Sequence, residues 1–450
     1  MSASSMVKRA INGSLLACLL IAAPGHAQKT EPVWGYKVRP GDRLIDIAKS
    51  YQKNPDDWKK LQQSNTVPDP KLLQPGKQIN IPVADLKQGD PFAAAVLVHG
   101  EVQRLDKSGQ PVAKVVSGDV LKMGDTIQTG ARSTLTVRFA DDSRMLVTEK
   151  SKITLSSLVN YGKTGMADTK VQVHQGGTDS QVSPQKGPVA RYEISTPALN
   201  LAVRGTGFRI QVDEGNGATR TEVVEGLVAG ESQGSQAMIA AGFGILAEPG
   251  KALGQPTRLL NAPVLSETSN LVKKLPARFE WTQLAGALRY RVQMLAVVQG
   301  NDAIIVDEVS DNNKAQWDEL PDGDYRLRVR GIDASGLEGA NATKAFTVKT
   351  RPEPPELSLP KNEHRSVDEK VVFRWSVAPQ AQDYRFQLAE DAEFKNLVAA
   401  VPRIAGSNRA VLFAVPAGQY YWRVASITST GDVGPFSDAF TFTRSAAATQ

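Results

Sequence analysis

The sequence predicts a multi-domain, mainly β protein with a small βααβ module, a central β-rich domain and two β-sandwich repeats. Three observations support this fold class. The chain has 450 residues, which is long for a single domain. Helical periodicity is confined to residues 36–82, whereas short alternating strands fill most of the remainder. A set of aromatic residues recurs about 94 residues later near the C-terminus, which is the size of one sandwich domain.

Residues 1–27 are predicted to be a secretory signal peptide. Lys8 and Arg9 form a positively charged start, residues 15–23 form a short apolar run, and residues 25–27 offer a cleavage site. The apolar run is too short to cross a membrane readily. We therefore expect a periplasmic mature chain without a transmembrane span.

Cys18 is the only cysteine of the chain, and it lies inside this apolar run. Residues 15–18 resemble part of a lipoprotein box, which would make Cys18 a lipidated N-terminus. The run stays apolar through residues 19–21, however, where a lipoprotein usually turns polar. We favour a cleaved signal peptide over lipidation. A mature chain without cysteine has neither a disulfide nor a thiol nucleophile.

Residues 36–82 predict a strand, two helices and a second strand. Tyr36 and Val38 alternate with polar residues, as one face of a short strand does. Asp42 is expected to cap the first helix. The apolar stripe of that helix consists of Leu44, Ile47, Ala48 and Tyr51.

The second helix of this segment is expected to begin at Asn54, with Pro55 in its first turn. Trp58 is expected to fill much of the small core, and Asn65 is expected to end the helix. Residues 79–82 alternate into a closing strand.

The ordered residues of this segment resemble the LysM module, and we assign residues 34–83 to it. The matching positions are Tyr36, Val38, Gly41, Asp42, Leu44, Ile47, Ala48, Tyr51, Trp58, Leu61, Asn65, Leu73, Pro75, Gly76, Ile79, Ile81 and Pro82. The resemblance implies binding to glycans that contain N-acetylglucosamine, in a bacterium most often peptidoglycan. The family binds sugar between the loop after its first strand and the loop before its last strand.

Carried over to this sequence, the resemblance implies a groove with two walls. One wall consists of Gly41, Asp42, Arg43 and Leu44, and the other consists of Leu72, Leu73, Gln74 and Pro75. An uncharged N-acetyl sugar needs backbone donors and acceptors and an apolar slot for its methyl group. Arg43 stands where the family usually has serine or threonine, which leaves helix capping and the sugar contact open at this position.

Residues 97–247 are predicted to form a domain of many short strands. Residues 134–139 alternate with period two, residues 141–143 turn the chain, and residues 145–147 return. Short strands joined by glycine, aspartate and serine turns are typical of a sandwich, a barrel or a roll.

Three segments are predicted to be connections. Residues 83–91 and 248–263 are interpreted as linkers. Residues 163–188 are rich in small and polar residues and are interpreted as a flexible insertion, although residues 171–173 alternate like a strand. Residues 204–207 could suggest a phosphate-binding loop, but their strand-like flanks favour a tight turn or bulge inside a sheet.

Two stretches of the central domain resemble the FecR domain. Their matching positions are Gly118, Asp119, Leu121, Gly124, Asp125, Ile127, Thr129, Gly130, Phe139, Asp141 and Ser143, then Ser195, Thr196, Pro197, Val203, Arg204, Gly205, Thr206 and Phe208. In iron-uptake regulators this domain relays an outer-membrane signal to an anti-sigma partner. Those regulators carry a cytoplasmic segment and a membrane anchor ahead of the domain. Here the resemblance implies an extracytoplasmic module that contacts an envelope protein or a polysaccharide.

The C-terminal part contains two copies of one pattern, at residues 264–350 and 354–445. Phe279, Trp281, Tyr290, Tyr325 and Phe346 of the first copy match Phe373, Trp375, Tyr384, Tyr420 and Phe440 of the second. The copies resemble fibronectin type III-like sandwiches. The tryptophan and tyrosine rows could form a sugar-stacking surface, but we favour a role in the core.

No catalytic, metal or cofactor site is expected. His99, His174 and His364 lie far apart and lack the spacing of metal ligands. The mature chain would also lack a cysteine nucleophile, and it has no GxSxG elbow. A net charge of +6 does not indicate nucleic acid binding; it would suit an anionic polymer such as cell wall, or an ordinary solvated surface.

We therefore expect an exported, non-enzymatic protein that is anchored to peptidoglycan through its LysM module. The β modules are expected to contact a protein or glycan partner. The leading alternative is an envelope signalling component whose FecR-like domain senses or relays a periplasmic signal. An assembly factor for a surface polysaccharide or a secretion machine is a third possibility.

Overall fold

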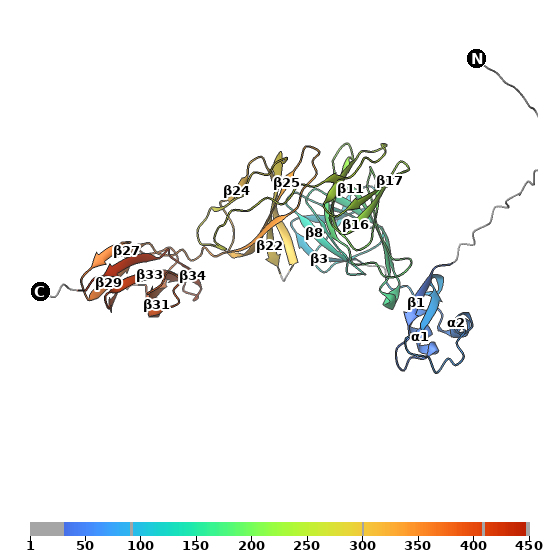
Figure 1. Cartoon of the computed structure of the whole chain (residues 1–450), viewed down its shortest axis with the longest axis horizontal. Coiled ribbons are helices and arrows are strands. Elements are labelled where there is room, and N and C mark those ends of the chain that lie inside the picture. Colours follow the sequence, from blue (N-terminus) through green and yellow to red (C-terminus); the bar gives the residue numbers. More distant parts are fainter. Residues whose placement is uncertain (1–30, 91–92, 299–300, 407–409, 447–450) are drawn as a thin grey trace, which may run out of the picture.

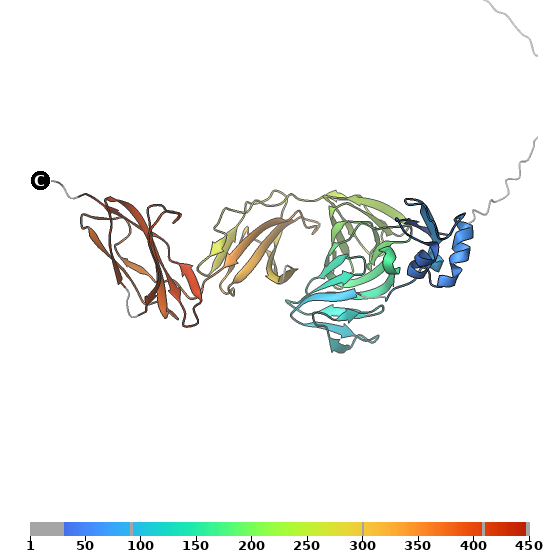
Figure 2. The ribbon, with the colours of Figure 1, turned by 90° about the horizontal axis from the view of Figure 1, so that it is seen from below.

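The computed structural model describes residues 31–90, 93–298, 301–406 and 410–446. The predicted signal peptide and Cys18 lie outside these residues. Strands make up 51% of the structure and helices 6%, which confirms the mainly β fold class. Figures 1 and 2 show an elongated molecule in which the βααβ module, the central domain and the two sandwiches follow one another. No helix in the described ranges is long and apolar enough to cross a membrane.

The βααβ module has the predicted order of elements. These are β1 (Val33–Lys37), α1 (Leu44–Tyr51), the 3₁₀ turn η1 (Pro55–Asp57), α2 (Trp58–Ser64), β2 (Gln78–Pro82) and the 3₁₀ turn η2 (Val83–Asp85). β1 and β2 pair antiparallel, with Val33 opposite Pro82. The second predicted helix starts as the turn η1, where the Asn54 side chain accepts a hydrogen bond from the Asp56 amide at 3.2 Å. Asn65 ends α2 as predicted.

Asp42 does not cap α1, contrary to the prediction. The helix begins at Leu44, so the N-cap position falls on Arg43, which makes no side-chain cap. The Asp42 carboxylate instead accepts hydrogen bonds from the Tyr36 hydroxyl and the Arg39 amide, both at 2.7 Å. Burial and this carboxylate raise the pKa of Tyr36 to about 12. Asp42 therefore ties its loop to the end of β1.

The core of the module is mostly aliphatic and is not centred on Trp58. Its buried side chains include Tyr36, Val38, Leu44, Ile47, Leu61, Val67, Leu73, Ile79 and Ile81. Trp58 is only partly buried and packs against the margin of this cluster. Because Trp58 is the first residue of α2, it covers the end of the helix, and the interior is filled by Leu61 one turn later.

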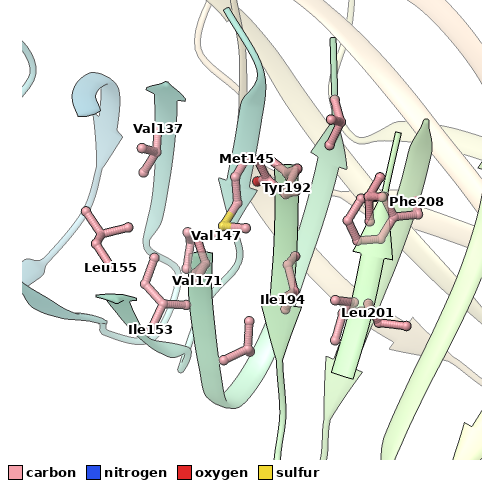
Figure 3. Close-up of a cluster of buried hydrophobic side chains, with 14 of the residues drawn as sticks. Val137, Met145, Val147, Ile153, Leu155, Val171, Tyr192, Ile194, Leu201 and Phe208 are labelled. Atoms are coloured by element: carbon pink, nitrogen blue, oxygen red, sulfur yellow. The ribbon is translucent and has the colours of Figure 1, made fainter. Parts of the chain in front are cut away.

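The central domain consists of two β-sheets that share one strand. The first sheet has the order β5 (Pro111–Lys114), β4 (Val102–Leu105), β7 (Thr126–Thr129), β10 (Lys152–Asn160), β11 (Ala167–Gln181), β12 (Arg191–Ser195), β13 (Asn200–Val203), β16 (Leu227–Ser232) and β17 (Ser235–Ala240). The second has the order β6 (Val120–Leu121), β3 (Ala93–His99), β8 (Thr134–Phe139), β9 (Arg144–Val147), β11, β14 (Gly207–Val212), β15 (Thr219–Glu225), β18 (Phe243–Ala247) and β19 (Thr257–Arg258). The apolar core lies between the sheets, where Figure 3 shows Val137, Ile153, Val171, Ile194 and Phe208.

Strand β11 overturns the prediction of a flexible insertion at residues 163–188. Its first part pairs with β10 and β12 in the first sheet, and residues 176–181 pair with β9 and β14 in the second. The strand crosses between the sheets at Gly176, which has a φ of +81° and where any Cβ would clash with Ser151. The small residues that suggested flexibility therefore permit a close crossing of two strands. A short 3₁₀ turn, η3 (Gly162–Thr164), precedes β11.

Two local predictions for the central domain are confirmed. Strands β8 and β9 form the predicted hairpin around residues 141–143. Residues 204–207 form a turn between β13 and β14, with Gly205 at a φ of +70° and a register shift between Gly207 and Phe208. The predicted linker at residues 248–263 is largely irregular but contributes β19 to the second sheet.

The C-terminal part forms two β-sandwiches, as predicted. The first pairs the sheet β20 (Leu271–Val272), β26 (Ala342–Val348), β25 (Gly323–Ile332), β22 (Arg289–Val298) and β23 (Asn301–Ser310) with β21 (Ala277–Glu280) and β24 (Lys314–Trp317). One sheet of the second sandwich has the order β28 (His364–Ser366), β35 (Phe440–Arg444), β33 (Gly418–Ile427), β30 (Asp383–Ala389) and β31 (Leu397–Ala405), and β34 (Val433–Phe436) also pairs with β33. The other sheet has the order β27 (Leu357–Leu359), β29 (Lys370–Trp375) and β32 (Ala410–Ala414).

The repeat extends to individual side chains. The Tyr325 hydroxyl donates to the Pro321 carbonyl at 2.8 Å, and the Tyr420 hydroxyl donates to the Pro416 carbonyl at 3.0 Å. This matched bond resembles the tyrosine corner of immunoglobulin-like sandwiches. The buried Trp281, Tyr290, Trp375 and Tyr384 belong to the two cores, which confirms core filling over a sugar-stacking surface.

One predicted match within the repeat is wrong. Phe346 lies opposite Tyr325 and stacks on it, and Phe442 does the same with Tyr420. Phe440, which the sequence offset selected, lies opposite Trp422. Phe440 and Phe442 are two residues apart on one strand face, so only strand register can distinguish them.

Candidate functional site

Two loops meet at one end of the βααβ module. Because Lys37 lies opposite Gln78 in the β1–β2 pair, the loop after β1 and the loop before β2 share one end. The Gly76 amide donates to the Val38 carbonyl, and the Leu44 amide donates to the Pro70 carbonyl, both at 2.9 Å. These bonds bring the predicted groove walls, residues 41–44 and 72–75, side by side.

The eight predicted groove residues differ in what they expose. The side chain of Leu72 is the most open of them, with 80% of its surface accessible. Gly41, Arg43, Gln74 and Pro75 are exposed, and Asp42 is half-buried. Leu44 and Leu73 are buried, with 0% and 8% accessible, so their side chains serve the core. Leu72 is therefore the apolar side chain on these loops that could cover an N-acetyl methyl group.

Backbone conformation and charge complete the geometry of the two loops. Gly41 and Gly76 both adopt a φ of +85°, a conformation that side chains rarely tolerate, with open space where a Cβ would stand. The Arg43 guanidinium binds the Asp46 carboxylate at 2.7 Å, so it is engaged by the first turn of α1. The loops thus present an apolar side chain, backbone groups and a neutralised charge pair.

The opposite end of the module is docked on the central domain. Met166 and Ala190 of the central domain are buried in the core cluster of the module, and Trp34 and Tyr51 pack against that cluster. The Lys87 amide also donates to the Tyr51 carbonyl at 2.7 Å.

The predicted linker at residues 83–91 is therefore wrong in its first part. Residues 83–85 form η2, and Leu86 is fully buried in the core of the module. The Gly89 amide donates to the Asn160 carbonyl at 2.8 Å. The contacts come from residues near 160 and 190, which sequence proximity could not reveal.

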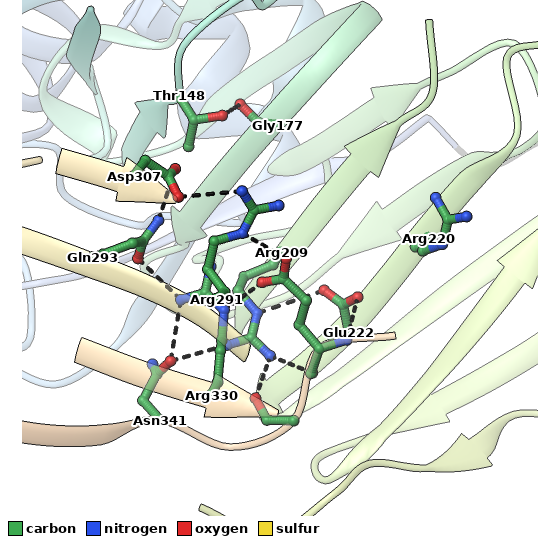
Figure 4. Close-up of polar contacts among 12 residues, drawn as sticks. Thr148, Gly177, Arg209, Arg220, Glu222, Arg291, Gln293, Asp307, Arg330 and Asn341 are labelled. Carbon is green, nitrogen blue, oxygen red and sulfur yellow. Dashed lines mark hydrogen bonds and ion pairs between the residues drawn. The ribbon is translucent and has the colours of Figure 1, made fainter. Parts of the chain in front are cut away.

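A buried ionic network joins the central domain to the first sandwich (Figure 4). Arg209 of β14 donates to the backbone carbonyls of Glu338 and Gly339 at 2.7 and 2.8 Å. The Glu222 carboxylate of β15 accepts from the Glu338 amide at 3.1 Å and lies 3.5 Å from the Arg209 guanidinium. Each domain therefore supplies partners for the charged groups of the other.

The sandwich side of the network is itself fully connected. Glu338 binds both Arg330 and Arg291, the latter at 3.0 Å. Arg291 also reaches Asp307 at 3.2 Å, and Arg330 donates to Gln293 at 3.0 Å. Three guanidinium groups thus face three carboxylates in the interface, which balances the buried charge.

The pKa values of Glu222 and Glu338 in this network are shifted in opposite directions. Burial raises the pKa of Glu222 to about 7, against the attraction of Arg209 and with added repulsion from Glu338. Burial alone would also raise the pKa of Glu338, but Arg330, Arg291 and Arg209 outweigh it and lower the pKa to about 2. The network therefore keeps the Glu338 carboxylate ionised, whereas the pKa of Glu222 lies close to neutral pH.

The network lines a small cavity of about 220 Å³ between the two domains. Its acids are already paired with arginines, so the arrangement is suited to fixing the domains together. Within the described ranges, no group of three or more His, Cys, Asp or Glu side chains could hold a metal ion. His174, one of the predicted unclustered histidines, bonds to Thr154 at 2.9 Å.

Sequence reasoning did not identify this network. Arg209 lies between two apolar residues, Arg330 follows a valine and Glu222 precedes one, which is the pattern of an ordinary solvated strand face. The available signal was the density of charge on strands of both domains. Partners more than a hundred residues apart, as Arg209 and Glu338 are, cannot be paired from that signal.

Two family models match the chain. A LysM domain model matches residues 36–82, and a FecR protein model matches residues 125–229. A search of curated proteins found no match. The chain therefore contains a LysM domain, which implies glycan binding, and a FecR region, which implies envelope signalling.

Solved structures match with low similarity. A putative anti-sigma factor from Parabacteroides distasonis matches at 12% identity with a TM-score of 0.25, over 30% of this chain and 59% of that protein. Fibronectin(III)-like modules of CbhA from Clostridium thermocellum match at 12% identity and a TM-score of 0.17, over 40% and 90% of the two chains. A two-domain fibronectin type III segment of chicken tenascin matches at 13% identity with a TM-score of 0.22, over 41% of this chain and 97% of that chain.

Proposed function

We propose that this protein is an exported, non-enzymatic peptidoglycan-binding protein that the LysM domain anchors to glycan containing N-acetylglucosamine. The observation that carries the proposal is the pair of hydrogen-bonded loops in the LysM domain, with Leu72 exposed between polar backbone groups. An uncharged N-acetyl sugar requires this combination of an apolar contact and backbone hydrogen bonds.

The way the LysM domain is mounted supports an anchoring role. The end that carries Trp34 and Tyr51 packs on the central domain, whereas the two loops lie at the other end of the β1–β2 pair. A docked module keeps its loops pointed away from the rest of the molecule. The FecR region and the sandwiches would then extend from the anchored end toward an envelope protein or a second glycan.

Sedimentation with isolated peptidoglycan sacculi tests the proposal. We expect the purified mature protein to pellet with sacculi and a Leu72→Asp variant to remain largely in solution. A charged side chain at this position would be buried against the sugar without a partner, whereas it costs little in the free protein because Leu72 is exposed.

A matched control separates this site from general stickiness. Leu288→Asp makes the same change at another exposed leucine, which lies on the first sandwich with 65% of its surface accessible. It should pellet like the unmodified protein. Equal pelleting of all three proteins would place the binding elsewhere, and a failure of all three to pellet would refute the glycan assignment.

The FecR match at residues 125–229 favours a second candidate, an envelope signalling component whose FecR domain senses or relays a periplasmic signal. The LysM domain would then only position the sensor. Transcript profiling of a gene deletion, complemented with the Leu72→Asp variant, distinguishes the two. Signalling predicts transcript changes that the variant still rescues in part, and simple anchoring predicts no transcript response.

A further inference from the structure

The outer face of the first sheet carries a hollow that the interdomain contacts leave uncovered. The first sandwich packs against the second sheet, through β14 and β15. On the first sheet, alternate residues of β12, β13, β16 and β17 point away from the core. Strand register aligns four of these residues in a row across the strands: Glu193, Ala202, Ala229 and Met238.

This row forms the floor of a trough. Two adjoining hollows of about 580 and 480 Å³ share these four residues. Each volume falls within the range of roughly 300–1,000 Å³ that is usual for small-ligand sites. The floor is low because Ala202 and Ala229 have small side chains. The larger apolar side chain of Met238 closes one end of the row, and 59% of its surface is exposed.

The rim of the trough presents free hydrogen-bonding groups. Asn200, Glu231 and Gln236 lie opposite one another in the next row along the sheet. Within the part of the chain that the structure describes, none of these three side chains has a hydrogen bond or ion pair. The charge of Glu193 is offset by Lys170, which binds it at 2.8 Å.

This chemistry selects the occupant. A peptide cannot add a strand over the floor, because β13 and β16 already have a paired neighbour on each side; the free edge lies beyond Met238, at β17. Over the floor, recognition comes from side chains, which supply donors and acceptors together on an apolar surface. Sugar hydroxyls donate and accept in the same way, and a sugar ring or N-acetyl methyl group would cover the alanines and Met238.

We propose that this trough is a second glycan-binding site, for an uncharged N-acetylated oligosaccharide. The sugar class rests on the function proposed for the LysM domain. The trough also adjoins that domain: Ala190 lines the smaller hollow and is buried in the LysM contact. Two weak sites on one rigid chain would bind a long glycan strand more tightly than either site alone.

Methionine-methyl NMR on the full mature chain tests this site with a defined probe, the tetramer of N-acetylglucosamine. Met238 reports on the trough, and Met123, which is 57% exposed on another part of the central domain, serves as the internal control. We expect the Met238 signal to shift saturably while the Met123 signal stays unchanged. The shift should persist in Leu72→Asp, whose LysM loops are impaired.

A double variant, Asn200→Ala with Gln236→Ala, should weaken the Met238 titration about tenfold, because two neutral hydrogen bonds are lost. Gln128→Ala, an exposed glutamine on β7 of the same sheet, should have no effect. A Met238 signal that ignores the tetramer, or a titration unchanged in the double variant, would overturn the proposal and leave the trough to a protein partner. If the Met238 signal does not shift while pelleting with sacculi still depends on Leu72, the trough assignment is wrong and the function proposed for the LysM domain stands.

Discussion

The central domain contacts the LysM domain through apolar side chains and contacts the first sandwich through charged ones. At the LysM junction, Met166 and Ala190 are buried among aliphatic and aromatic residues. At the sandwich junction, Arg209 and Glu222 are buried with only 4% and 2% of their side chains accessible. Both junctions hold two domains together, but they do so by different forces.

The difference determines how each junction responds to its surroundings. An apolar contact is non-directional, so it tolerates small shifts and depends little on salt or pH. A buried ionic network requires every partner, because any group left alone keeps its full desolvation penalty. The sandwich junction should therefore be specific and sensitive to single changes, whereas the LysM junction should fail gradually.

The largest effect is expected from Arg209→Ala. Removing this guanidinium leaves the carbonyls of residues 338–339 without their donor and the buried Glu222 carboxylate without its cationic partner. We expect a loss of about 3–5 kcal/mol in the stability of the joined domains, measured by denaturant unfolding. Arg138→Ala, an exposed arginine on β8, is the control. Adding Glu222→Gln should recover part of the loss, and an unchanged double variant would refute the pairing.

A smaller effect is expected from Met166→Ala at the LysM junction. Truncating this buried side chain should cost about 2 kcal/mol, the lower end for such a deletion, because the cavity lies at a small contact. Small-angle scattering should then show a wider spread of LysM orientations. The effect should be the same at low and high salt. A strong salt dependence would contradict the apolar description of this junction.

A pH dependence should appear at the sandwich junction only. Burial holds the pKa of Glu222 near 7, above the ordinary value of 4.5. The docked state therefore binds a proton more tightly than the open state. Docking should gain stability as the pH falls from above 7 toward 4.5. Below 4.5 the folded protein should lose stability, because the unfolded chain then takes up a proton at Glu338 that the native state, in which the pKa of Glu338 is about 2, does not bind.

This pH profile is measured by thermal unfolding across the pH range. Glu222→Gln removes the group that titrates near neutrality, so it should flatten the profile above pH 4.5 and leave the acid limb intact. A profile that falls as the pH drops from 7 to 5, or an unchanged profile in the variant, would contradict the assignment.

The smallest effect is expected between the two sandwiches. Lys349 bridges Asp322 at 3.2 Å and Asp432 at 3.0 Å, and Asp432 is more than half exposed. Lys349→Ala should cost at most about 1 kcal/mol, and added salt should mask the difference. Scattering curves at two salt concentrations measure it. A loss as large as that of Arg209→Ala would break the contrast between buried and exposed ion pairs.

The sequence predicted the elements whose cause is local. Periodicity located the first helix near residue 44, the Asn54 cap located the turn that leads into the second helix, and strict alternation located β8. The LysM loops followed from the order of their residues. β11 was misread because glycine and serine indicate flexibility unless a neighbouring strand, here carrying Ser151, is known to pass close by.

The junctions depend on long-range contacts and were missed for that reason. In the sequence, Met166 is an apolar residue in a polar stretch, and Arg209 lies between the apolar residues Phe208 and Ile210. Neither pattern names a partner, since the LysM contact and the Glu338 turn come from distant parts of the chain. Strand register similarly created the trough, because it aligned two alanines that are separate in sequence.

Hydrogen–deuterium exchange with soluble peptidoglycan glycan fragments tests the central claim most directly, namely that the LysM loops hold the sugar while the docked domains stay fixed. We expect slower exchange at amides in residues 39–44 and 69–76 when fragments are added, and no change at the two junctions of the central domain. Unchanged exchange in both loops, with protection elsewhere in the chain, would contradict the claim.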